Sequence, residues 1–299
     1  MVSRLSPSNE SFLAALNRIA DRAERATRQI ATGYRITAAS DAPDDISILL
    51  QARVEVERTE QIRANLGRVK TEVDTAEEML RSAVSIMERA RVLGAQGASE
   101  TQTAESRAAA AEEVTGILRQ LVSIAGTSVD GRYIFSGDAD QKPPYAWDDS
   151  QPYPVSGYQG GAATRLAQHP SGLAFGVSRS GDAIFDAAGN SVFQAVFQLS
   201  SALSANDTAA IEAALAAVTA AGVHLNRQLA FYGSVQGQVN SAMADASRMK
   251  LRLETEISRL QEADLTESIL ELNQARFHQQ AALEARAKLP QTSLFDFLR

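Results

Sequence analysis

The chain has 299 residues, a formal charge of −7 and no cysteine. The lack of cysteine excludes a disulfide framework, a cysteine-ligated zinc or iron–sulfur site and a thiol nucleophile. With 36 acidic against 29 basic residues, the chain also lacks the basic balance typical of proteins that bind nucleic acid or anionic membranes. Much of its hydrophobic content is alanine, the best helix former, which favours long helices lying close together.

Proline and glycine divide the chain into three parts. Five of the eight prolines lie within 143–170, and ten of the 18 glycines lie within 126–189. Because proline costs about 3 kcal/mol inside a helix, long helices are expected on either side of this centre. We therefore predict a mainly α fold, in which both ends of the chain form a long coiled-coil helical bundle and a small β-rich domain is inserted between them. The predicted divisions are a terminal assembly helix (1–40), the two parts of a helical rod (41–125 and 206–260), the inserted outer domain (126–205) and a second terminal assembly helix (261–299).

The first predicted helix carries apolar residues at alternating spacings of four and three, which is the a/d pattern of a coiled coil. Gly33 interrupts this pattern. The residues of this first seam are Phe12, Leu16, Ile19, Ala23, Ala26 and Ile30.

A second, longer helix is predicted from about residue 44 to about 94. Residues 40–45 supply a capping side chain, a proline for the first turn and acids for the positive end of the helix dipole. Apolar positions then keep the four–three spacing throughout 62–90. We expect this middle seam to pack within the chain. Ser99, with Gln102 three residues later, resembles a capping box for a further helix to about residue 125.

The centre of the chain is predicted to form short strands separated by turns. Strand-like runs occur near 133–135, 155–159, 164–168 and 173–178, followed by a predicted helix over 191–204 and a helix cap at 206–207. Four aromatic residues in this region could stack on a sugar or a base. We favour a role in the core, because small domains need large side chains to fold. These residues are Tyr145, Trp147, Tyr153 and Tyr158.

The heptad pattern returns over 235–260 and again from Leu265. The terminal segments 12–30 and 265–289 lie at opposite ends of the chain, and short helices of this kind are marginal alone. We therefore expect both segments to pack against copies of the chain in an assembly rather than against each other, and to be loose in the monomer. Besides the first seam, the predicted assembly residues are Leu265, Ile269, Leu272, Leu283, Leu294, Phe297 and Leu298.

No catalytic motif is apparent in the sequence. The three histidines are isolated, and the chain has no nucleophile elbow, phosphate-binding loop or dinucleotide-binding fingerprint. We therefore predict no catalytic, metal-binding or cofactor-binding residue, no cofactor and no enzymatic activity. Charge interrupts every apolar stretch before the roughly 20 residues that a membrane span needs, and the start of the chain lacks the apolar core of a signal peptide.

Several segments, in order along nearly the whole chain, resemble the bacterial flagellin family. In the N-terminal part these are ATGYRITAASDAPDD (31–45) and the pair Asn65–Leu66, although Ala42 stands where the family more often has an acid. In the centre they are GRYIFSG (131–137), YQGG (158–161) and SGDAIF (180–185), which resemble signatures of the hook–filament junction proteins of that family. In the C-terminal part they are YGSVQGQVN (232–240), ISRLQEADLTESI (257–269) and SLFDFLR (293–299).

The resemblance implies a structural protein of the bacterial flagellum, exported through the flagellar type III apparatus and therefore extracellular. It implies a helical layer that joins hook-associated protein 1 to the flagellin filament. The implied partners are those two proteins, copies of the chain itself and a flagellar export chaperone, with no nucleic acid and no membrane. The alternatives are a flagellin that forms the bulk filament, a cytoplasmic coiled-coil scaffold, and an enzyme or sugar-binding module in the central domain.

Overall fold

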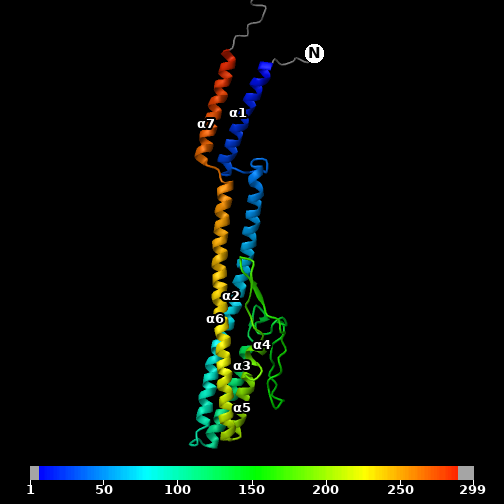
Figure 1. Ribbon diagram of the computed structural model, residues 1–299, viewed down its shortest axis with the longest axis vertical. Helices are drawn as coiled ribbons and strands as arrows, with labels where there is room; N and C mark the ends of the chain where they lie inside the picture. The colour runs from blue at the N-terminus through cyan, green and yellow to red at the C-terminus, as the bar shows by residue number, and fades with distance from the viewer. Residues whose placement is uncertain (1–6, 289–299) are drawn as a thin grey trace, which may run out of the picture. The chain divides into compact units, whose positions relative to one another are not determined.

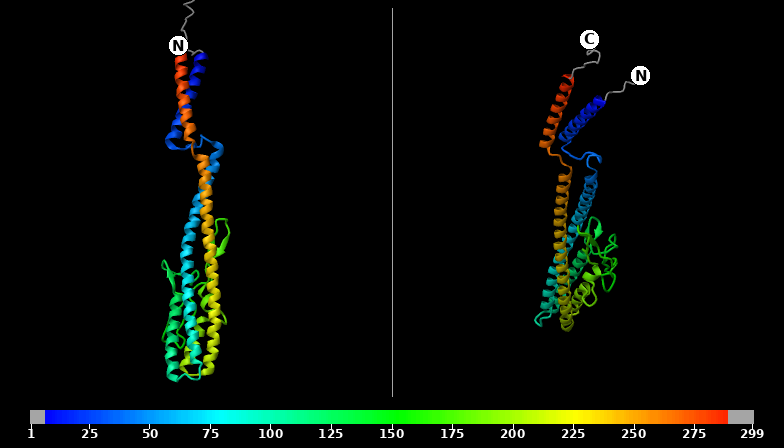
Figure 2. Two further views of the ribbon diagram at one scale, coloured as in Figure 1. Left: turned by 90° about the vertical axis from the view of Figure 1, so that its left-hand side faces the viewer. Right: turned by 45° about the horizontal axis from the view of Figure 1, so that its top comes forward.

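The structure is a computed structural model that describes residues 7–288 (Figures 1 and 2). The described chain is mainly α, as predicted. Its helices are α1 (Pro7–Thr32), α2 (Pro43–Gly97), α3 (Ala104–Ala125), α4 (Gly181–Phe185), α5 (Val192–Ser204), α6 (Thr208–Gln261) and α7 (Leu265–Lys288). Its strands are β1 (Ser128–Val129), β2 (Arg132–Tyr133), β3 (Leu166–Gln168) and β4 (Ala174–Gly176).

The chain divides into two compact units. The terminal unit holds residues 1–58 and 250–299, and the central unit holds residues 59–249. Helices α2 and α6 contribute residues to both units. The division therefore falls inside the two helices of the predicted rod.

In the terminal unit, α1 and α7 pack side by side (Figure 1). The loop that follows α1 also pairs with the end of α6 and with the loop that precedes α7. Arg35 N–H donates to the Gln261 carbonyl at 2.6 Å, and Ala263 N–H donates to the Gly33 carbonyl at 2.9 Å. Gly33 has a φ of +74°, which favours glycine over any residue with a Cβ. Its position beyond the end of α1 explains why the heptad pattern stops there.

The start of α2 differs from the prediction in one detail. The Asp41 carboxylate accepts hydrogen bonds from the backbone N–H groups of Thr37 (2.9 Å) and Ala38 (2.8 Å), so it closes the preceding loop rather than capping the helix. The first bond of the helix goes instead from Ile46 N–H to the Ala42 carbonyl, at 3.1 Å. The hydrogen bonds that Thr37 and Ala38 donate to the Asp41 carboxylate hold its pKa below the usual range.

The central unit is built on one contiguous hydrophobic core shared by α2, α3, α5 and α6. Every position of the middle seam over 62–90 is buried except Val69, which packs against the core partly buried. On α6, Val235, Val239 and Ala242 are buried in the same core. The prediction that the middle seam packs within the chain is confirmed.

Helix α6 is long and apolar enough to cross a membrane by length and composition, which the sequence interpretation did not find. Three of its apolar side chains, Ile211, Val218 and Leu225, are nevertheless at most 1% exposed and belong to the core. Such burial against other helices is typical of the central helix of a helical bundle.

The turn between α2 and α3 corrects the predicted capping box. The N-cap of α3 is Thr103, whose hydroxyl accepts from Ser106 N–H at 3.2 Å. The carbonyls of Gly97 and Ser99 accept instead from the buried guanidinium of Arg107, at 2.7 and 3.0 Å. Ser99 therefore belongs to a turn fastened by Arg107, and not to a helix start.

The centre of the chain contains two antiparallel hairpins, β1–β2 and β3–β4, and a single bridge between Trp147 and Val155. The strands are only two or three residues long, which is shorter than the predicted runs. Proline lacks the N–H that a ladder needs, and the prolines at 143–154 separate these short pairs. The predicted helix over 191–204 is present as α5, and Ser191 caps it by accepting from Gln194 N–H at 3.2 Å.

Candidate assembly surface

Helices α1 and α7 form an antiparallel pair joined by polar contacts along their length. Arg22 lies 3.1 Å from the Glu271 carboxylate, and the Ser268 hydroxyl donates to the Gln29 side chain at 3.2 Å. Further along, the Arg286 guanidinium lies 5.5 Å from the centre of the Phe12 ring. The expectation that the two terminal segments would pair only with copies of the chain is therefore wrong for α1 and α7.

The pair buries few side chains, because small alanines sit where the helices meet. On α1, Ala26 is completely buried, while the other residues of the first seam are half-buried. On α7, Ser268 and Ala275 are the two buried residues. A contact of this size supplies little hydrophobic stabilisation at about 25 cal/mol per Å².

Most of the predicted assembly residues on α7 lie on the surface of this pair. Leu265 and Ile269 are each 48% exposed, Leu283 is 49% exposed and Leu272 is half-buried. The predicted residues Leu294, Phe297 and Leu298 lie outside the described residues.

Sequence reasoning missed two exposed apolar residues of α7, Leu270 and Phe277, which are 57% and 70% exposed. They lie seven residues apart and off the predicted seam. With a rotation of 100° per residue around the helix axis, Leu270 and Phe277 lie within an arc of about 140° that also holds Leu265, Ile269 and Leu283. We call this surface the α7 apolar face, and it consists of Leu265, Ile269, Leu270, Phe277 and Leu283.

The three signature segments of the centre meet at one carbonyl group. The Phe135 carbonyl, from GRYIFSG, accepts from Gly181 N–H at 2.7 Å and from the Tyr158 hydroxyl at 3.0 Å. Beside it, a Cβ on Gly137 would lie 2.1 Å from the Gly161 carbonyl oxygen, and the φ of Gly137 is +60°. The glycines of these segments therefore allow a backbone approach that side chains would prevent.

The central aromatic residues divide between core and surface. Tyr145 is 3% exposed, with ring centres 4.8 Å from Phe193 and 5.6 Å from Tyr158, so it belongs to the core as favoured from the sequence. Burial, with the nearby aspartates, raises the pKa of the Tyr145 hydroxyl. Tyr153, at 36% exposed, lies at the surface.

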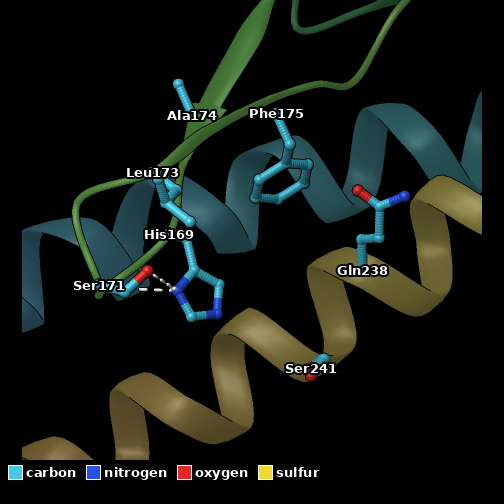
Figure 3. A pocket seen from close by; sticks show the side chains of 7 residues that line it. All are labelled: His169, Ser171, Leu173, Ala174, Phe175, Gln238 and Ser241. Atoms are coloured by element: carbon cyan, nitrogen blue, oxygen red, sulfur yellow. Dashed lines mark hydrogen bonds between the residues drawn. The ribbon is translucent and has the colours of Figure 1, made fainter.

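A pocket of about 370 Å³ lies between the β3–β4 hairpin and α6 (Figure 3). In it, Nδ1 of His169 lies 2.8 Å from the Ser171 hydroxyl, and Nε2 lies 3.3 Å from the Asp245 carboxylate. This order resembles a Ser–His–Asp triad, but Nδ1 also accepts from Ser171 N–H at 3.1 Å, and Gly172 N–H is bonded to the His169 carbonyl at 2.9 Å. The Ser171 and Gly172 amides are thus bonded within the turn and are not free to form an oxyanion hole. Through its contact with Asp245, His169 links the hairpin to α6.

The described residues contain no group of three or more His, Cys, Asp or Glu side chains that could hold a metal ion. His224 is buried and lies 3.0 Å from the Ala183 carbonyl, which ties α6 to α4.

Comparisons with known proteins agree with this arrangement of terminal helices around a central insertion. The profile of the bacterial flagellin N-terminal helical region matches residues 6–140, and that of the bacterial flagellin C-terminal helical region matches residues 215–298. Together the two regions cover well over half of the chain. The chain belongs to the bacterial flagellin family. Proteins of this family are structural components of the flagellum, and this member is likewise a structural protein of bacterial motility.

The chain is similar in sequence to a flagellin and in fold to solved structures of flagellar hook-associated proteins. The flagellin of Clostridium tyrobutyricum is 28% identical over 116 residues, which are 39% of this chain and 31% of that protein. The chain thus matches about a third of the length of that relative. Among solved structures, flagellar hook-associated protein 3 from Legionella pneumophila has a TM-score of 0.62 at 16% identity, covering 72% of this chain and 98% of that one. FlgL from Bacillus cereus has a TM-score of 0.57 at 23% identity, covering 71% of this chain and 100% of that one. At these identities the likeness concerns the fold alone.

Proposed function

We propose that this flagellin-family protein is the adaptor at the hook–filament junction, equivalent to hook-associated protein 3. The observation that carries the proposal is the cluster at the Phe135 carbonyl, where GRYIFSG, YQGG and SGDAIF meet. These segments resemble junction-protein signatures, whereas the terminal helices are shared with flagellin. The fold is also similar to that of hook-associated protein 3 over almost the whole of that chain, as this proposal requires.

In this role the chain forms a helical layer of its own copies between hook-associated protein 1 and the flagellin filament. The terminal segments 1–40 and 261–299 supply the contacts between copies, the helices over 41–125 and 206–260 form a rod, and the insertion over 126–205 faces outward. The α7 apolar face supports this arrangement, because the free energy falls when a neighbouring copy covers exposed apolar surface of this kind. The chain reaches the extracellular flagellum through the type III export apparatus with the help of a flagellar export chaperone.

Deletion of the gene tests the adaptor role. The mutant is expected to carry hooks without filaments and to release flagellin monomers into the medium, and a plasmid copy of the gene should restore filaments. Normal filaments in the deletion strain would overturn the proposal.

Mass spectrometry of sheared filaments separates the adaptor from the bulk flagellin. A trace of this chain beside a large excess of another flagellin supports the adaptor. If the chain is the dominant component, it is the filament protein itself.

A further inference from the structure

A second pocket, of about 450 Å³, lies in the central unit between the 153–157 loop, the end of α4 and one face of α5. This volume falls in the range of pockets that hold small ligands. Its walls combine two aromatic rings with a carboxylate and two carboxamides. The residues that carry these groups are Tyr153, Phe197, Asp186, Gln194 and Gln198.

The aromatic wall is formed by Tyr153 and Phe197, whose ring centres lie 5.1 Å apart at an interplanar angle of 81°. Asp186 lines the same pocket as these rings, and burial, together with the Asp186 charge, raises the pKa of Tyr153 to about 12. A π face beside a carboxylate is the combination that attracts a cation, because both the ring quadrupole and the negative charge favour it.

The polar groups of the pocket are free to bind. The side chains of Asp186, Gln194 and Gln198 are exposed, and among the described residues none of them has a hydrogen-bond or ion-pair partner. One turn before Asp186, a buried oxygen of the Asp182 carboxylate also lacks a hydrogen-bond partner. Burial, and after it the charges of Asp186 and Asp182, raise the pKa of Tyr145.

Arg119, a basic residue of the same region, is engaged elsewhere. Its guanidinium lies 3.3 Å from the Asp149 carboxylate and 4.9 Å from the centre of the Trp147 ring. Asp186 is exposed, so a cation from outside the chain can reach its carboxylate.

We propose that this pocket binds the guanidinium group of an arginine side chain that another protein molecule presents. Guanidinium is planar, stacks on aromatic rings and offers five N–H donors, which suit the Asp186 carboxylate and the amide oxygens of Gln194 and Gln198. Lysine offers a more strongly hydrated point charge and fits this flat, mixed wall less well. A neutral sugar could use the carboxamides but would leave the carboxylate without a counter-charge. The proposal concerns the centre of the chain and does not depend on the adaptor role.

The test titrates the full-length monomer with acetyl-Gly-Arg-Gly-amide and follows binding by isothermal calorimetry. The matched ligand replaces arginine with citrulline, which keeps the shape and removes the charge. The fluorescence of Trp147, the single tryptophan, reports on the same region, because Trp147 pairs with Val155 beside the pocket. The variants are D186N and Y153L, with E112Q on the exposed surface of α3 as the charge-matched control.

We expect the arginine peptide to bind weakly and the citrulline peptide to bind at least about fivefold less well, with a similar loss for D186N and for Y153L. E112Q should bind as the wild type does, and added salt should weaken binding. Equal binding of the two peptides, binding that survives both pocket substitutions, or no detectable binding at 10 mM peptide, a concentration on the order of the weakest useful affinity, would each overturn the proposal.

Discussion

Phe277 offers the sharpest test of the α7 apolar face. Its ring is 70% exposed, although an aromatic ring is usually among the most buried side chains of a helix. If copies of the chain cover this face in the assembly, Phe277→Ala should weaken assembly while leaving the isolated monomer as stable as the wild type.

The expected magnitude follows from the exposed area. A phenylalanine side chain buries about 200 Å² when fully covered, so roughly 140 Å² of Phe277 is available to a neighbour. At about 25 cal/mol per Å², covering this area contributes up to about 3.5 kcal/mol for each copy. This corresponds to a loss of up to roughly 300-fold in the affinity of one copy for the next.

The assay compares monomer and assembly in the same variant. Thermal unfolding followed by circular dichroism should give the same Tm for Phe277→Ala and the wild type, and electron microscopy of cells that carry the variant should show many hooks without filaments. Gln274→Ala is the matched control, since Gln274 is exposed on the same helix and is polar. If Phe277→Ala cells keep normal filaments, or if Gln274→Ala is equally defective, the α7 apolar face is not the surface that copies cover.

Three further predictions concern the fold. Leu80→Ala removes a completely buried side chain of α2 and should lower the free energy of unfolding by about 3 kcal/mol, measured by urea denaturation. Gly137→Ala should destabilise the centre, because its Cβ would lie 2.1 Å from the Gly161 carbonyl oxygen, whereas Gly233→Ala on α6 meets open space and should stabilise the protein by about 0.5–1 kcal/mol in the same assay. The lowered pKa of Asp41 means that its loop contacts contribute fully above the ordinary pKa of 3.8 and are lost as the pH falls through the lower value of the folded state. An NMR titration of the Asp41 carboxyl should therefore show a midpoint below 3.8, and a midpoint at or above 3.8 would contradict the bonds described.

The heptad pattern predicted which residues of the central unit are buried because burial there depends on local periodicity. A residue that recurs every three or four positions stays on one side of a helix, whatever the partner is. The seam over 62–90 therefore indicated both the helix and its buried side. The pattern cannot identify the partner, and for α1 the partner proved to be α7 of the same chain.

Features that depend on distant residues could not be read from the sequence. Ser99 and Thr103 are both plausible helix caps by local rules, and the choice is settled by Arg107, whose side chain binds the carbonyls of Gly97 and Ser99. The exposure of Phe277 was missed for a similar reason. An apolar residue off the seam is buried or exposed according to what lies beside the helix, and periodicity does not report this.

The helices of the two units differ in how much apolar side-chain surface the chain buries within itself. This difference predicts which helices are stabilised by contacts between copies. In the central unit, large side chains of the helical core such as Leu66, Leu80 and Tyr232 are at most 2% exposed, although Leu166 and Leu173 of the β3–β4 hairpin are exposed. In the terminal unit, the α1–α7 pair buries mainly alanine and serine and leaves larger apolar side chains exposed. Segments with few buried contacts unfold locally at a lower free-energy cost than a well-packed core does. A protease should therefore cut the monomer near residues 33–40 and 262–264 before it cuts within 59–249, and covering the α7 apolar face in the assembly should remove that difference.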